Sequence, residues 1–154
     1  NNIHSYLNKI NLQRYKGRCL HYESGVRCKK IINAHSIQKS GALNSIAHNG
    51  HVYRLTAELS RLKKNKGKAI FHKIGINKAS TFLGFCEKHD NDLFEPIDNY
   101  PLIPTDQQIF LYGYRSLCRE LFVKENALNV TDKLIKDGPN QKAIIELLLN
   151  VSRG

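Results

Sequence analysis

Four cysteine and histidine residues of the chain have the identities and the spacing of metal ligands. Two residues separate Cys86 from His89, so that a single turn of the chain can place both side chains on one ion. Cys19 and Cys28, with eight residues between them, are the candidates for the other half of a tetrahedral site. Because thiolate and imidazole are ligands that Zn²⁺ prefers, these four residues predict a structural zinc site. The alternative is that they are ordinary core and surface residues.

The composition is that of a soluble globular domain. The chain has 154 residues, of which 41% are hydrophobic and 24% are charged. No apolar run approaches the ~20 residues of a membrane span, and residues 1–14 lack the apolar core of a signal peptide. We therefore expect an intracellular, cytoplasmic protein, in which cysteines are more often metal ligands or buried thiols than disulfides. Cys118 falls in an apolar helical stripe with Leu111, Tyr114, Leu121 and Phe122 and is predicted to lie in the core.

The charge of the chain suggests a polyanionic partner. The formal net charge is +11, from 24 Lys and Arg against 13 Asp and Glu. Nucleic acid, DNA in particular, is a better match than a membrane, because no basic amphipathic helix with a bulky apolar face is visible. The densest basic run is predicted to contact phosphates through Arg61, Lys63, Lys64, Lys66 and Lys68. A solvated hairpin tip and a cationic solubilising surface are the alternatives.

Several elements must position these residues. Those predicted before Cys86 are a short helix over 3–16, a hairpin over 18–32 with its turn at 23–25, a helical turn over 42–47, strands over 50–55 and 68–76, and a helical turn from Asn77 through Phe82 and Leu83. The hairpin would bring Cys19 and Cys28 together. His35 follows an apolar run, and a helix is predicted to start at His89 and to end at Pro96.

The carboxyl-terminal part reads as helical. Residues 96–104 hold three of the four prolines and predict a connection between residues 1–95 and a helical subdomain over 105–154. Thr105, followed by Gln108, has the pattern of a capping box. The predicted helices span 106–126, 131–137 (closed by Gly138) and 140–151. The last has a broad apolar surface, from which we expect packing against the rest of a longer chain, a second copy or another protein.

The order of these residues resembles that of a known superfamily. Cys19, Cys28, Ala34-His35, Cys86, His89 and Asp90 resemble, over about residues 18–95, the zinc-stapled form of the HNH, or His-Me finger, nucleases. The resemblance implies an α+β fold with a ββα-metal, treble-clef-like core and a helical carboxyl-terminal part. It also implies hydrolysis of DNA phosphodiester bonds, and a role as a bacterial defence effector rests on the resemblance alone.

The resemblance assigns catalytic roles to two residues. His35 matches the general base, since a neutral imidazole can take a proton from the attacking water. Asp90 stands where a metal-binding histidine would be and would hold a catalytic Mg²⁺ or Mn²⁺, with Asn91 or Asp92 assisting. Ala34 occupies a position where many members have a metal-binding Asp. A zinc-stapled, non-catalytic module that binds nucleic acid or protein is therefore the alternative, with His35 structural and Asp90 an acidic residue near a helix start.

Overall fold

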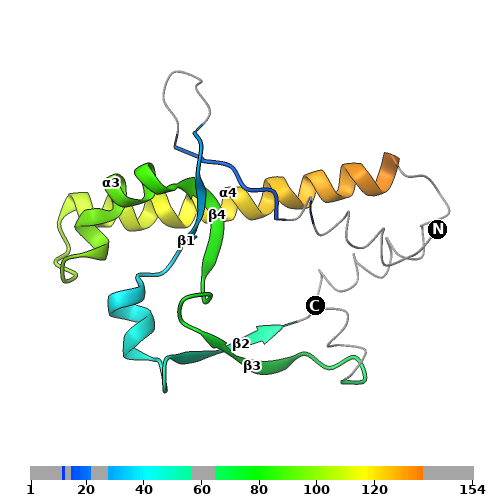
Figure 1. Ribbon diagram of the computed structural model, residues 1–154, viewed down its shortest axis with the longest axis horizontal. Coiled ribbons are helices and arrows are strands. Elements are labelled where there is room, and N and C mark those ends of the chain that lie inside the picture. The colour runs from blue at the N-terminus through cyan, green and yellow to red at the C-terminus, as the bar shows by residue number, and fades with distance from the viewer. Residues whose placement is uncertain (1–11, 13–14, 22–27, 57–64, 137–154) are drawn as a thin grey trace. The chain divides into compact units, whose positions relative to one another are not determined.

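The protein is an α+β structure with two small antiparallel sheets, seen here in a computed structural model (Figure 1). The structure describes residues 12, 15–21, 28–56 and 65–136. The elements are β1 (Ile31–His35), the single π-helical turn η1 (Lys39–Leu43), β2 (His51–Thr56), β3 (Ile70–Gly75), β4 (Thr81–Cys86), α3 (Glu87–Asp98) and α4 (Asp106–Lys136). Gly17–Phe122 form one compact unit. Asn1–Lys16 and Val123–Gly154 form another, whose described part is mainly the end of α4.

The first sheet pairs β1 with β4, two strands that are separated in sequence by residues 36–80. Ile31 is opposite Cys86 and His35 is opposite Thr81, with an irregularity between Ile32 and Ala34. The backbone N–H groups of Arg18 and Leu20 donate to carbonyls of β4, with a nitrogen–oxygen distance of 2.9 Å in each bond. Both segments before and after residues 22–27 therefore lie against the same strand.

The pairing of β1 corrects the predicted hairpin over 18–32. Among the described residues of that range, 18–21 form no strand, and only β1 is paired, with β4 as its partner. The predicted turn at 23–25 lies outside the described residues. Gly17 allows the observed arrangement, because a Cβ there would come within 3.0 Å of Leu83 Cβ and 3.1 Å of Ile31 Cγ2.

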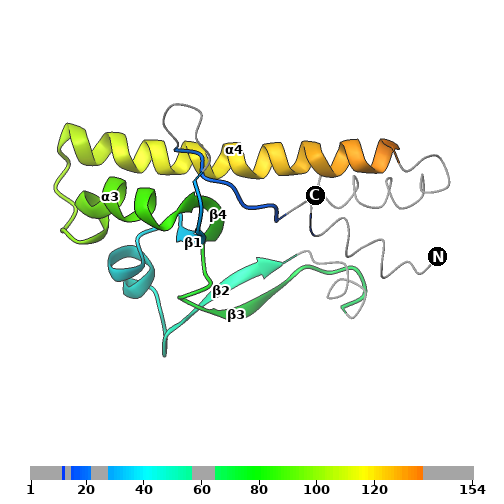
Figure 2. The same cartoon turned by 45° about the horizontal axis from the view of Figure 1, so that its top comes forward.

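The second sheet is the hairpin of β2 and β3, which Figure 2 shows as neighbouring arrows. It confirms the strands predicted over 50–55 and 68–76, and η1 with the helical residues that follow it lies where a helical turn was predicted. The helical turn predicted from Asn77 was wrong. Residues 76–80 form a tight turn, in which Lys78 and Ala79 N–H donate to the Gly75 carbonyl, and Phe82 already belongs to β4.

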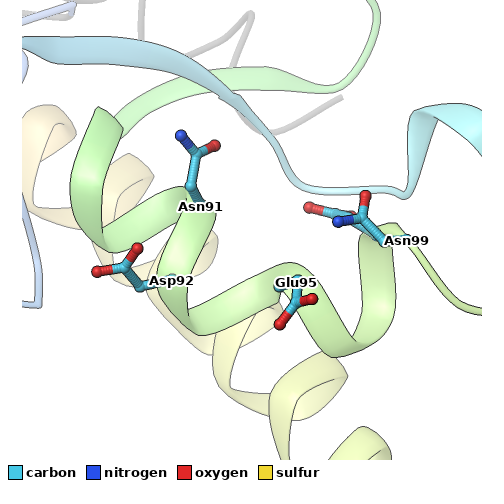
Figure 3. Close-up of a pocket in the computed structure, with 5 residues that line it drawn as sticks. Asn91, Asp92, Glu95 and Asn99 are labelled. Atoms are coloured by element: carbon cyan, nitrogen blue, oxygen red, sulfur yellow. The ribbon is translucent and has the colours of Figure 1, made fainter.

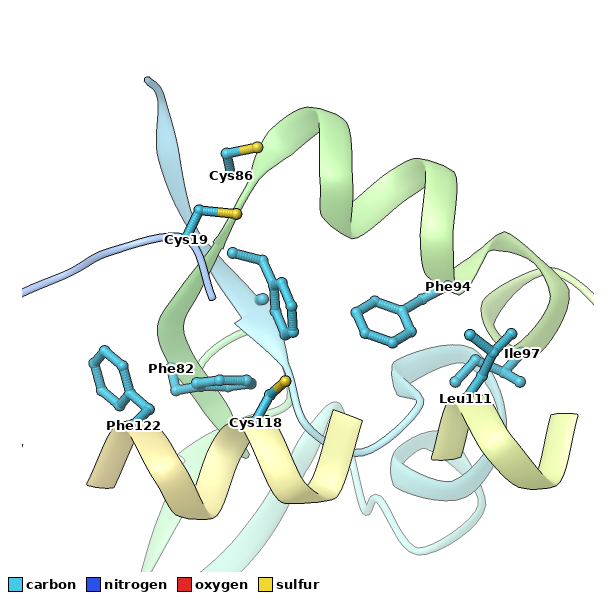
Figure 4. Packing of buried hydrophobic residues seen from close by; sticks show 10 residues of the cluster. Cys19, Phe82, Cys86, Phe94, Ile97, Leu111, Cys118 and Phe122 are labelled. Carbon is cyan, nitrogen blue, oxygen red and sulfur yellow. The ribbon is translucent and has the colours of Figure 1, made fainter. Parts of the chain in front are cut away.

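Aromatic rings from β4 and α3 form the core of the Gly17–Phe122 unit (Figure 4). Phe85 and Phe94 are fully buried and pack edge to face, with ring centroids 5.0 Å apart. The first half of α4 adds Leu111, Cys118 and Phe122, which recur at helical spacing. The burial of Cys118 confirms its predicted place in the core, whereas Leu121 of the same predicted stripe is exposed.

Helix α3 is longer than predicted. It starts at Glu87, with Cys86 as N-cap, and ends at Asp98, so Pro96 lies inside the helix and does not end it. Proline deprives the helix of one N–H donor and crowds the preceding turn, but here only two helical residues follow it. The buried Gln108 amide donates to the carbonyls of Pro96 (2.9 Å) and Pro101 (3.1 Å) and so ties down the proline-rich connection.

Helix α4 runs without a break from Asp106 to Lys136. The sequence instead predicted one helix over 106–126 and another over 131–137. Residues 127–130 include Asn and Val, whose cost in a helix is only a few tenths of a kcal/mol each, too small to end it. Gln108 N–H donates to Thr105 Oγ1 at 3.3 Å, which is one of the two bonds of the predicted capping box. The Gln108 side chain instead accepts from Ile103 N–H and donates to the Pro96 and Pro101 carbonyls. The helices predicted over 3–16 and 140–151 lie outside the described residues or almost entirely so.

Within the part of the chain that the structure describes, no helix combines the length and the apolar composition needed to cross a bilayer.

The core makes one prediction about stability. Phe94→Ala is expected to lower the free energy of unfolding by about 3–5 kcal/mol, because the buried ring leaves a cavity. Phe110→Ala removes the same ring from a site on α4 that is 66% exposed, and its expected cost is about 1 kcal/mol or less. Urea denaturation followed by circular dichroism measures both values. Equal losses in the two variants would contradict this core.

Candidate metal centre

Three thiols and one imidazole meet at the end of the β1–β4 ladder. Cys19 comes from the segment bonded to β4, Cys28 from just before β1, Cys86 from the last position of β4, and His89 from the first turn of α3. Their ligand atoms all lie within 4.8 Å of one another. Figure 4 shows the sulfurs of Cys19 and Cys86 directed to the same side. The structure thus brings together the four residues predicted as ligands, and the group could hold a metal ion.

The imidazole of His89 faces two of the sulfurs through Nδ1. This atom is 3.3 Å from Cys19 Sγ and 3.4 Å from Cys28 Sγ. The ring of His21 packs edge to face on the His89 ring, with centroids 5.0 Å apart, and His21 Nδ1 forms a 3.0 Å hydrogen bond with the Tyr114 hydroxyl. His21 and Tyr114 therefore support the orientation of His89 from outside the group. The sequence placed Tyr114 in an apolar helical stripe, and it predicted a role at the metal centre for neither residue.

Burial and neighbouring groups shift the pKa values of Cys28 and Cys86. Loss of hydration raises the pKa of Cys28 to about 11, and hydrogen bonds and charge repulsion from Cys19 and Cys86 act in the same direction. At Cys86 burial opposes the thiolate, but the backbone N–H groups of His89 and Lys88 and the two other thiols lower its pKa overall. A thiolate at Cys86 would also be favoured by the α3 N-terminus. Three thiolates at this separation require a cation between them.

A pocket of about 350 Å³ contains His35. The described residues that line it are His35, Lys39, Ser40, Asn44, Ile76, Asp90, Asp98 and Asn99. His35 ends β1, and its Nε2 is 3.1 Å from the Ile76 carbonyl oxygen. A carbonyl only accepts, so this bond assigns the proton to Nε2 and leaves Nδ1 with a free lone pair.

Asp90 follows His89 on α3 and lines the pocket with His35. Its Oδ1 atom is buried and has no hydrogen-bond partner among the described residues. Burial raises the pKa of Asp90, the charge of Asp98 adds to the rise, and Arg115 and His35 oppose it. A buried carboxylate oxygen without a donor is costly unless a cation or proton satisfies it. The pocket is therefore lined by an imidazole and by a carboxyl group with one unsatisfied oxygen, and the roles predicted for His35 and Asp90 stay predictions.

Asp98 is the second carboxylate of this pocket, and sequence reasoning missed it. Arg115 of α4, 1% exposed, holds it through a bidentate ion pair with N···O distances of 2.8 and 2.5 Å. Asp90 and Asp98 are two helical turns apart on α3, a spacing that could have indicated a shared side. Asn91 and Asp92 instead line a separate pocket of about 290 Å³ with Glu95, Asp98 and Asn99 (Figure 3). Neither Asn91 nor Asp92 is among the described residues that line the His35 pocket, and the assisting role expected for either of them stays a prediction.

The basic run predicted to contact nucleic acid is described only in part. Arg61, Lys63 and Lys64 lie outside the described residues. Lys66 and Lys68 are exposed in and after the turn that precedes β3, where Lys66 has a φ of 53°. Neither is among the described residues that line the His35 pocket. Their contact with phosphates stays a prediction.

Comparison with family models, with curated proteins and with solved structures gives no match. The function of the chain is therefore argued from the chemistry of the metal centre and the His35 pocket.

The first prediction for this site concerns metal content. The purified chain is expected to hold one metal ion, measured by plasma mass spectrometry after purification without chelators. Cys28→Ala is expected to weaken metal affinity more than about 100-fold, since even lost outer contacts cost 10–100-fold. Cys118→Ala, a buried cysteine outside the group, serves as the matched control and should retain the ion. A metal-free wild type, or equal loss in both variants, would contradict the site.

Proposed function

We propose that the chain is a metal-dependent endonuclease that hydrolyses DNA phosphodiester bonds, with His35 as the general base. The observation that carries the proposal is the pocket in which the free Nδ1 of His35 shares the lining with the unsatisfied Oδ1 of Asp90. An imidazole with a free lone pair can take a proton from a water molecule as that water attacks phosphorus. The Ile76 carbonyl holds the ring in the tautomer that this step requires.

The arrangement of elements around the pocket supports the same proposal. A strand that ends at the histidine (β1) pairs with a strand (β4) that leads directly into the helix bearing Asp90. This is the order expected of a ββα-metal core, with residues 36–80 inserted between its two strands. The metal centre lies where the second strand passes into the helix, and so fixes the start of α3 relative to β1.

Zinc is the metal we propose for the four-ligand group. Tetrahedral Zn²⁺ with bonds of about 2.3 Å to sulfur and 2.05 Å to nitrogen separates these ligands by about 3.6 Å. The two sulfur–nitrogen distances of 3.3 and 3.4 Å are close to that value. Four protein ligands leave no open position for a substrate, so the ion would be structural.

A second divalent cation, Mg²⁺ or Mn²⁺, fits the His35 pocket through Asp90. The fit rests on the buried Oδ1 atom, which needs a positive partner, and carboxylate oxygen is the ligand that these hard cations prefer. When bound, such an ion would neutralise the charge of the phosphate and stabilise the leaving oxygen. Asp98 is engaged by Arg115, so Asp90 is the carboxylate free to serve.

One observation favours a second candidate, a zinc-stapled module that binds nucleic acid without cleaving it. Ala34, at the position where the resembling nucleases often have a metal-binding Asp, is 1% exposed and packs in the core. It offers no ligand, and a cation on few ligands binds weakly.

The endonuclease proposal predicts that His35→Ala abolishes Mg²⁺- or Mn²⁺-dependent nicking of plasmid DNA. Loss of a general base lowers the rate by about 10²–10⁴-fold, which gel electrophoresis of supercoiled plasmid resolves. His51→Ala is the matched control, because His51 is exposed and is not among the described residues that line the pocket. Unchanged nicking by His35→Ala would rule His35 out. A wild type that binds DNA but never nicks it would favour the non-catalytic module.

A further inference from the structure

The outward face of the β2–β3 hairpin exposes large apolar side chains that the proposed chemistry does not use. Tyr53, Leu55 and Phe71 are 66%, 55% and 67% exposed. The register places Tyr53 opposite Lys73 and Leu55 opposite Phe71, so these four side chains share one face. Val52 and Ile74 on the other face pack with Leu43 and Ala79. The hairpin is therefore anchored by one face and presents the other to solvent.

The segment of sequence that contains this hairpin is strongly basic. Residues 28–86 contain eleven Lys and Arg and one acidic residue, Glu58, so this segment carries +10 of the net charge of +11. Lys73 Nζ lies 5.9 Å from the centre of the Tyr53 ring, and Lys66 and Lys68 precede β3 in sequence. Lysine is depleted in protein–protein interfaces. A face that combines exposed aromatic rings with lysines fits a polyanion whose bases are accessible.

We propose that this face binds single-stranded DNA, with unpaired bases stacked on Tyr53 and Phe71 and the strand's phosphates close to Lys73. Stacking on aromatic side chains beside basic groups is the general way in which proteins hold single strands without reading their sequence. Tyr53 and Phe71 are diagonal neighbours on the ladder, about 7–8 Å apart, so both rings can serve one strand. Paired bases stack on each other inside a duplex and expose only their edges.

The choice of DNA rests on the proposed function. The inference adds to that function that this surface holds DNA in its single-stranded form. Binding and cleavage are measured separately, because the rings belong to the hairpin and are not among the described residues that line the His35 pocket. Loss of nicking in His35→Ala with unchanged strand binding would leave this inference intact. Loss of strand binding in the hairpin variants with nicking of plasmid retained would leave the proposed nuclease intact.

The test is fluorescence anisotropy with labelled dT20 and a 20-base-pair duplex, at fixed salt and without added Mg²⁺ or Mn²⁺. Tyr53→Ala and Phe71→Ala are each expected to weaken dT20 binding about 5- to 150-fold, with little change for the duplex. Phe110→Ala is the matched control, since this ring is equally exposed on α4; its affinity should stay within about twofold of the wild type. Tyr53→Leu, which keeps apolar area but loses the ring, is expected to behave as Tyr53→Ala.

Several outcomes would overturn the inference. One is that the wild type shows no detectable binding of dT20. Another is that Tyr53→Ala and Phe71→Ala bind dT20 as tightly as the wild type does. Another is full binding by Tyr53→Leu, because general hydrophobic contact would then suffice. A tenfold preference for rU20 over dT20 would overturn the assignment to DNA. If sedimentation velocity shows a dimer that Phe71→Ala dissociates while dT20 binding is retained, the face is a contact between copies of the chain.

Discussion

The convergence of three sulfurs and one imidazole within 4.8 Å is the constraint on which the rest of the site depends. The segments that supply them are separated by up to 70 residues, and closing such loops costs conformational entropy. Loss of hydration, with a smaller contribution from the neighbouring thiols, raises the pKa of Cys28 and so opposes its ionisation. The zinc ion that we propose for this group would offset both costs, because structural zinc contributes on the order of 10 kcal/mol to folding. His89, held in this way, places Asp90 one residue further along α3.

Packing then carries this constraint from the metal centre to the far end of the pocket. Phe94 lies between the first turn of α3 and Asp98, and the Arg115 guanidinium stacks on its ring, with Cζ 3.9 Å from the centroid. The same guanidinium holds both oxygens of Asp98. A buried ion pair adds little net stability, but removing one partner is strongly destabilising. Its effect here is geometric, since it keeps Asp98 from turning toward Asp90 and leaves Asp90 as the unpaired carboxylate of the pocket.

Features set by local sequence could be predicted, and those set by distant contacts could not. The ligand types and the spacing of Cys86 and His89 identified the metal group, and alternation of side chains identified β2 and β3. The partner of β1 could not be inferred, because nothing near residues 31–35 encodes a register with residues 81–86. Pro96 was taken as a helix end although two more residues follow it in α3. Asp98 was missed because its role depends on Arg115, which reaches it from another helix.

The distribution of charge explains how one small unit could attract DNA and still keep carboxylates for a cation. The +10 of residues 28–86 is followed at once by α3, whose twelve residues hold five acidic side chains and one lysine. In the proposed function, a phosphate backbone would be drawn to the basic segment and repelled by α3. Asp90 lines the pocket with His35, whereas Asp92 and Glu95 line the other pocket. A divalent cation on Asp90 would reverse the local sign there, so that a phosphate drawn in by the basic segment could approach His35 without meeting uncompensated negative charge.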